Sequence, residues 1–134
     1  MIRRRGPDRG SMAVETVLVA PVLVAFLLLV VAFGRYVAIR GEVEAATRDA
    51  VRAASLERSP AAARREANRT AAATLDGRDC TAVGLGGAFV AGGTITTTLR
   101  CKVSFDQLGL LGLPGSVSVT ATSSAPLDVY RRVV

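Results

Sequence analysis

Residues 16–34 read TVLVAPVLVAFLLLVVAFG, a run without a single charged side chain. A helix needs about 20 mostly apolar residues to cross a bilayer. The run is just long enough, so it predicts a transmembrane helix from Thr16 to Gly34. Pro21 lies in its first turns, where proline disturbs a helix less than at its centre and where a kink can form. The rest of the chain must be arranged around this one helix.

The composition agrees with a membrane segment. The chain has 134 residues, which is enough for one domain, and 50% of them are hydrophobic although only 4% are aromatic. The apolar mass is therefore expected in the membrane helix rather than in a large soluble core. The sequence has no histidine, which excludes catalytic triads and metal sites built on histidine, and its two cysteines are too few for a cysteine-only zinc site.

The charges on either side of the run predict its orientation. The residues before it include four arginines against one aspartate, namely Arg3, Arg4, Arg5 and Arg9 against Asp8. Positively charged flanks stay in the cytoplasm, so the N-terminus is predicted to be cytoplasmic and the bulk of the chain extracytoplasmic. Because Arg35 and Arg40 follow the run, the contrast in charge is modest.

Two other interpretations of the run are a plain membrane anchor and a cleaved signal peptide. A signal peptide has an apolar stretch of about 7–15 residues, shorter than this run, although residues 32–34 (Ala-Phe-Gly) offer a small-x-small cleavage site. Glu15 fits neither interpretation well, because it stands at the mouth of the apolar run. A carboxylate there is costly unless it has a partner charge.

The stretch RGSMAVETVLVAPVL, residues 9–23, resembles the leader junction of type IV pilin-like proteins. Such a junction has a short basic leader ending in glycine, a cleavage point, four mostly apolar residues and then a glutamate. Here the leader would be Met1 to Gly10, Ser11 would become the first residue, and Glu15 the fifth. The short leader, Pro21 and the small size resemble TadE-like minor pilins, or pseudopilins, of the tight-adherence (Flp) pilus and secretion machinery.

This resemblance implies partners and a site. Prepilin peptidase, a membrane aspartyl protease, would cut after Gly10 on the cytoplasmic side, and this chain would be its substrate. The mature chain would assemble with other pilin or pseudopilin subunits and with the pilus assembly platform. In major Flp pilins an aromatic residue follows the glutamate, whereas here Thr16 does, which favours a minor subunit. The new amine of Ser11 would lie one helical turn from Glu15 and could pair with it.

Beyond the membrane, the sequence predicts two helices. Apolar or small residues recur at spacings of three and four, at Ile39, Val43, Ala46, Ala50, Ala53 and Leu56, which is an amphipathic helical stripe. Arg40, Glu44 and Arg48 at four-residue steps can form ion pairs. Ser59 and Pro60 read as the N-cap and first residue of a second, alanine-rich helix that runs to about Leu75 and stops near Gly77.

The last third of the chain alternates with a period of two, which predicts strands at residues 95–105 and 116–124. Residues 81–83 or 88–91 are candidates for a third strand. The glycine-rich residues 84–93 read as a flexible connection. The loop at residues 106–115 carries Leu108, Leu110, Leu111 and Leu113, which would be either tucked under the sheet or exposed as a docking knob.

Cys80 and Cys101 are predicted to form a disulfide, because the predicted topology places both in an oxidising compartment. The bond would tie the end of the second helix to the first long strand. Two buried free thiols and a bond between subunits are the alternatives.

The sequence as a whole predicts an α+β, pilin-like chain with four regions: a basic leader (1–10), a transmembrane helix (11–34), a helical stalk (35–78) and a small antiparallel β region (79–134). The predicted function is that of a single-pass pseudopilin of the cytoplasmic membrane. Whether the subunit stays in the membrane or is incorporated in a pilus is left open by the sequence. The alternative is an unprocessed, membrane-anchored adaptor or binding module. No catalytic constellation, cofactor motif or metal-ligand pattern is seen, and the scattered arginines do not predict a nucleic-acid or small-molecule site.

Overall fold

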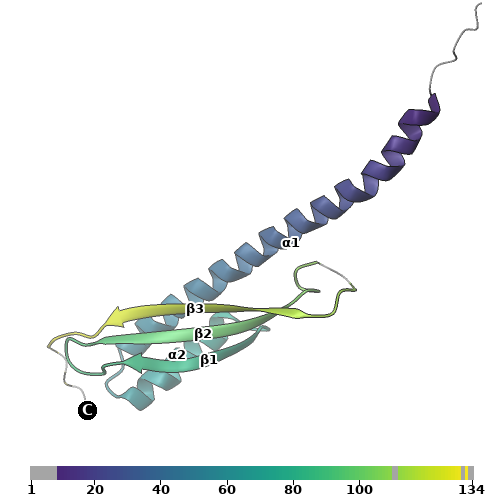
Figure 1. Cartoon of the computed structure of the whole chain (residues 1–134). Helices are drawn as coiled ribbons and strands as arrows, with labels where there is room; N and C mark the ends of the chain where they lie inside the picture. The colour runs from purple at the N-terminus through teal and green to yellow at the C-terminus, as the bar shows by residue number, and fades with distance from the viewer. Residues whose placement is uncertain (1–8, 110–111, 131, 133–134) are drawn as a thin grey trace, which may run out of the picture.

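A single helix, α1, runs through the first part of the chain and carries everything that follows (Figure 1). The computed structural model describes residues 9–109, 112–130 and 132. The elements are α1 (Arg9–Ser55), α2 (Pro60–Thr74), β1 (Asp79–Gly87), β2 (Thr94–Ser104) and β3 (Ser116–Pro126). The predicted order of long helix, short helix and small antiparallel sheet is confirmed. Most of the predicted leader, and the side chains of Leu110 and Leu111, lie outside the described residues.

Helix α1 has 47 residues and continues through Pro21, Gly34 and Gly41. At about 1.5 Å per residue, it is roughly 70 Å long. The predicted long N-terminal helix is therefore present, and it ends at Ser55. A helix of this length can cross a bilayer and still project into the outer region of the protein.

The outer half of α1 buries one stripe, as the sequence predicts. Ile39 and Val43 are 6% and 0% exposed, and Ala46 and Ala50 are both fully buried. The prediction is wrong for Leu56, which is 76% exposed. Leu56 follows the last residue of α1, so helical spacing no longer decides which way its side chain points.

The buried stripe ends on Val51 and Ala54 instead, which are 2% and 0% exposed, whereas Ala53 is only half-buried. An α-helix turns once every 3.6 residues, so a stripe defined by steps of three and four can be continued by either of two neighbouring positions. Packing of α1 against α2 and the sheet selects between these positions, and the spacing alone could not.

Helix α2 begins as the sequence predicts. The Ser59 side chain accepts a hydrogen bond from the Ala62 amide at 3.3 Å, and Pro60 is the first helical residue. The cap satisfies an amide that has no partner within the helix. The helix ends at Thr74, and Gly77 follows with a φ of 77°, a left-handed conformation that glycine adopts easily.

Alanines form the contact between the two helices. The buried residues of α2 are Ala63, Ala67 and Ala71, and they face a helix whose own buried stripe is also rich in alanine. Small side chains bring helix backbones close together but bury little area each. The second half of α1, α2 and the sheet together form a folded unit, here called the outer domain. Its stability therefore also depends on the larger apolar side chains of the sheet.

The three strands form one antiparallel sheet in the order β1-β2-β3. β1 contains residues 81–83, one of the two candidates for a third strand. The predicted flexible connection at residues 84–93 is wrong in its first part, because residues 85–87 pair with β2 after an irregularity between Ala82 and Leu85. A Cβ atom at Gly87 would overlap the carbonyl oxygen of Thr94, so the close pairing of the backbones there requires glycine.

The inner face of the sheet confirms the predicted alternation. Ile95, Leu99, Cys101 and Val103 of β2 are at most 1% exposed, and all belong to the same buried cluster as the stripe of α1. β2 ends at Ser104, one residue before the predicted end, and Phe105 is half-buried. The sheet thus packs its apolar face against the helices and leaves its threonine-rich and serine-rich face outside.

Replacing Ala63 with leucine should destabilise the outer domain by about 1–3 kcal/mol, because Ala63 is fully buried and a larger side chain overpacks a close contact of this kind. Ala72→Leu is the matched control on the exposed face of α2, where it should change stability by less than about 0.5 kcal/mol. Thermal unfolding of the full chain in a mild detergent, followed by circular dichroism, measures both. Equal effects of the two substitutions would contradict the alanine-lined contact.

Candidate membrane and assembly segment

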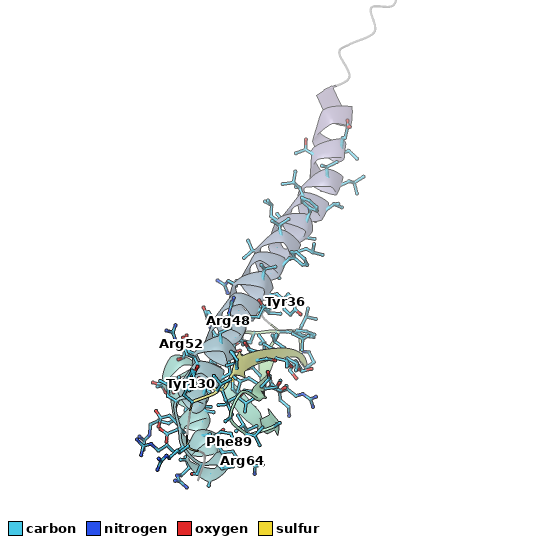
Figure 2. All side chains as sticks on the ribbon, turned by 90° about the vertical axis from the view of Figure 1, so that its left-hand side faces the viewer. Tyr36, Arg48, Arg52, Arg64, Phe89 and Tyr130 are labelled. Atoms are coloured by element: carbon cyan, nitrogen blue, oxygen red, sulfur yellow. A yellow bond between two sulfur atoms is a disulfide. The ribbon has the colours of Figure 1, made fainter. Side chains whose placement is uncertain are left out.

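The first half of α1 is an apolar cylinder that the rest of the chain leaves uncovered. Its large apolar side chains from Val14 to Phe33 are between 50% and 72% exposed, and Figure 2 shows side chains projecting from every side of this part of the helix. Exposure of so much apolar surface to water is strongly unfavourable. This surface must therefore be covered by lipid, by other apolar helices, or by both.

The dimensions of the segment fit a bilayer. The uncharged residues 16–34 extend for about 29 Å along the helix, and the hydrocarbon core of a bilayer is about 30 Å thick. Within the part of the chain that the structure describes, α1 is the one helix long and apolar enough to cross a membrane. It lies near the N-terminus and indicates a single-pass membrane protein.

The predicted processing junction lies in the first turns of α1. Gly10 and Ser11 are both helical, and Glu15 lies on the exposed surface one turn further on. Residues four apart in a helix share a face, so the backbone brings Ser11 and Glu15 to the same side. The side chains of residues 10–13 are outside the described part of the structure, and a Ser11–Glu15 ion pair therefore stays a prediction.

The three residues singled out in the span have different surroundings. Thr16 opens the uncharged run within an unbroken helix. Pro21 has no amide hydrogen and cannot donate to the carbonyl of Val17, yet the helix continues on both sides. A Cβ atom at Gly34 would meet no atom within 4 Å, so this glycine is not required by packing within the chain.

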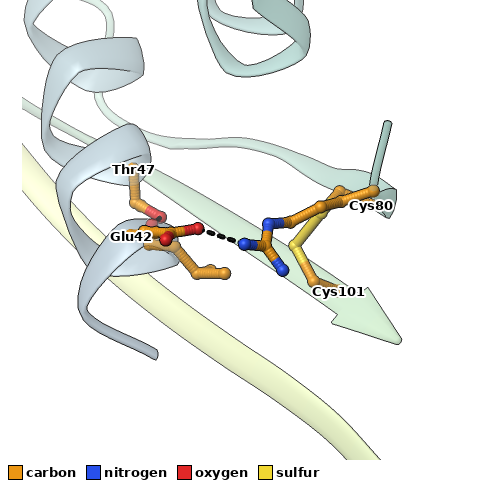
Figure 3. Close-up of a disulfide and its surroundings, with 6 residues drawn as sticks. Glu42, Thr47, Cys80 and Cys101 are labelled. Atoms are coloured by element: carbon orange, nitrogen blue, oxygen red, sulfur yellow. Dashed lines mark hydrogen bonds and ion pairs between the residues drawn. A yellow bond between two sulfur atoms is a disulfide. The ribbon is translucent and has the colours of Figure 1, made fainter. Parts of the chain in front are cut away.

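The disulfide forms within one chain. The sulfur atoms of Cys80 and Cys101 are bonded at 2.07 Å, and the two residues are direct partners in the β1–β2 register (Figure 3). The bond therefore joins two neighbouring strands, whereas the sequence predicted a link from the end of the second helix to a strand. Cys80 belongs to β1, which begins one residue earlier, at Asp79.

An ion pair beside the disulfide was not predicted from the sequence. The guanidinium of Arg78 donates to the carboxylate of Glu42 (Figure 3), and so it connects α1 to the turn before β1. The two residues are 36 positions apart, and no local spacing could have paired them. The predicted helical pairs are confirmed only in part. Arg40 bonds the Glu44 carboxylate at 3.1 Å, but Arg48 donates to the Glu44 backbone carbonyl.

The chemistry available to this arrangement is that of packing and insertion. Among residues 9–109, 112–130 and 132, no group of three or more histidine, cysteine, aspartate or glutamate side chains is placed to hold a metal ion. The prominent features are an uncovered apolar helix, a carboxylate at its start and a folded domain attached to its other end.

The comparison with protein families agrees with this geometry. Residues 10–52 match the TadE-like protein family. The N-terminal segment is thus similar to TadE-like proteins. No curated protein and no solved structure is found to match the chain. The TadE-like match begins at Gly10, the residue predicted to end the leader, and it stops within α1, three residues before the helix ends at Ser55. It therefore covers the apolar segment of α1 and most of the helix beyond it, and does not extend to α2 or the sheet.

Reduction of the disulfide should destabilise the outer domain by roughly 3 kcal/mol, because the bond closes a loop of about 20 residues in the unfolded state. Thermal unfolding with and without a reductant measures the effect. A variant with both Cys80→Ala and Cys101→Ala is the control, and it should not respond to the reductant. A disulfide-linked dimer on a non-reducing gel would contradict the bond within one chain.

Proposed function

We propose that this protein is a pseudopilin, a minor pilin-like subunit of a tight-adherence (Flp) pilus assembly machine. Prepilin peptidase removes the leader after Gly10, and the mature subunit assembles through α1 with other pilin or pseudopilin subunits and the assembly platform. The observation that carries this proposal is the TadE-like match over residues 10–52, which falls on a helix whose apolar first half is uncovered.

The proposal gives Glu15 a physical role. Cleavage would create a positively charged amine on Ser11, one helical turn before the Glu15 carboxylate. A charged side chain in the membrane costs on the order of 3 kcal/mol at the bilayer centre and less near its surface. Pairing with the amine of the same or a neighbouring subunit would offset this cost. Glu15 would therefore favour helices that associate in one register.

The same proposal sets the topology of the subunit. The arginine-rich leader would stay on the cytoplasmic side, where the peptidase acts, and the outer domain would be extracytoplasmic. A disulfide in the outer domain supports this orientation, because such bonds persist in oxidising compartments. The arginines near the N-terminus would then be lost with the leader, which ends at Gly10.

The mature N-terminus is the decisive test of processing. Mass spectrometry of the membrane-bound protein should find a chain that begins at Ser11 when prepilin peptidase is present and at Met1 when it is absent. Gly10→Val should block cleavage, because the peptidase would no longer find glycine before the cut. Gly6→Val, at the other glycine of the leader, is the matched control and should be processed normally.

Two outcomes of this experiment would overturn the proposal. A chain that begins at Met1 even with the peptidase present would be a plain membrane anchor, and its outer domain an adaptor or binding module. A chain that begins near Arg35 would have lost its apolar segment as a signal peptide.

A substitution of Glu15 with glutamine should leave the leader cleavage intact but reduce recovery of the protein with its partner pilin subunits several-fold. The amide keeps the size of the side chain and removes the charge that would pair with the Ser11 amine. Val17→Ala changes the same uncovered segment without altering its charge and should have little effect. Equal recovery of all three proteins after crosslinking and purification would show that Glu15 has no role in assembly.

A further inference from the structure

The outer domain reaches the membrane boundary on one side of α1. From Val14 to Val31 every residue of α1 is exposed, and Ala32 is the first buried one at 8% exposure, whereas its neighbours Val31 and Phe33 are 51% and 66% exposed. Ala32 lies inside the uncharged run, about half a helical turn before its end at Gly34. The domain therefore covers one face of α1 at the level where the helix would leave the hydrocarbon.

The β2–β3 loop lies at this boundary. Arg35 is the first charge after the run, and a Cβ atom at Gly109 would lie 3.0 Å from one of its guanidinium nitrogens. The backbone at Gly109 is thus in contact with the Arg35 side chain. Leu108, the residue before it, is buried in the same cluster as Ala32 and Ile39. In Figure 1 this loop is at the end of the sheet nearest the uncovered part of α1.

The described parts of the loop divide into an anchored and an exposed side. The anchored side is a tight turn, in which the Leu108 and Gly109 amides donate to the carbonyls of Phe105 and Asp106 at 3.1 Å and 2.9 Å. On the other side Leu113 is 58% exposed, between Gly112 and Pro114, which are also exposed. An apolar side chain is therefore held in the open beside the end of a membrane span.

We propose that residues 112–115, the exposed side of the β2–β3 loop, contact lipid and place Leu113 in the boundary between the headgroups and the acyl chains of the adjacent leaflet. We call these residues the lipid-contacting foot. Apolar side chains next to a span gain by burial in this layer. Arg35 would lie at the level of the lipid phosphates, where a guanidinium can donate paired hydrogen bonds. The acidic Asp106 is also exposed on this loop, so the contact would be mainly apolar rather than a basic attraction to anionic lipid.

The lipid-contacting foot would add a second point of contact with the membrane beside α1. This contact would restrict the tilt of the outer domain relative to the membrane while the subunit is in the bilayer. Figure 2 shows the two ends of the domain. Tyr36 lies at the end nearest the uncovered helix, and Phe89 and Arg64 lie at the opposite end. The proposal requires α1 to cross the membrane, but it does not require cleavage after Gly10.

A single added cysteine can test this contact, because both native cysteines are held in the disulfide and none is free. The full chain with Leu113→Cys would carry a fluorophore and be placed, one copy each, in phosphatidylcholine nanodiscs containing lipids with a nitroxide near the headgroup. Leu56→Cys is the matched control. Leu56 is also an exposed leucine, but it lies roughly 30 Å further along the helix axis from Arg35.

The lipid nitroxide should quench the probe at residue 113 several-fold more strongly than the probe at residue 56. Equal, weak quenching at both sites would overturn the proposal, because it would place the loop in water. An apolar emission spectrum at residue 113 without quenching would also overturn it, since protein and not lipid would then cover the site. Both labelled chains should retain the circular dichroism of the unlabelled protein, and neither result depends on peptidase processing.

Discussion

One helix has to satisfy two different solvents. The first half of α1 carries apolar side chains on all sides, and its second half is apolar along one stripe and charged elsewhere. Each half satisfies its backbone hydrogen bonds internally, which is required in lipid and favourable in water. Within the described residues, α2 and the sheet pack against the buried side of α1, from Ala32 to Ala54.

The buried core is formed by two kinds of side chain, small ones between the helices and larger ones on the sheet. Alanines bring the two helices together, and the largest fully buried side chains include Ile95, Leu99 and Val103 of β2. Within this core Thr97 is 2% exposed, and its hydroxyl has no hydrogen-bond partner among the described residues. Such a group weakens a core. The disulfide and the Glu42–Arg78 pair add links at the side of the domain where β1 begins.

The sequence predicted elements better than contacts. The apolar run, the Ser59 cap and the alternation in β2 depend on local spacing, and all three were predictable. The position of Leu56 and the pairing of residues 85–87 were not, because tertiary packing and close backbone pairing decide them. The Glu42–Arg78 pair and the contact of Arg35 with Gly109 join segments far apart in the chain, and no local pattern encodes them. The candidate junction at Gly10, Ser11 and Glu15 rests on its motif alone and stays a prediction.

The unbroken backbone of α1 has a mechanical consequence. Since no turn or linker separates Arg9 from Ser55, a rotation of the membrane half about its own axis must turn the outer domain through the same angle. The side of α1 that contacts a neighbouring helix in the bilayer therefore determines the direction, within the plane of the membrane, in which the threonine-rich face of the sheet points. Helix packing within the membrane would thus set the orientation of the outer domain, because α1 transmits its rotation without loss.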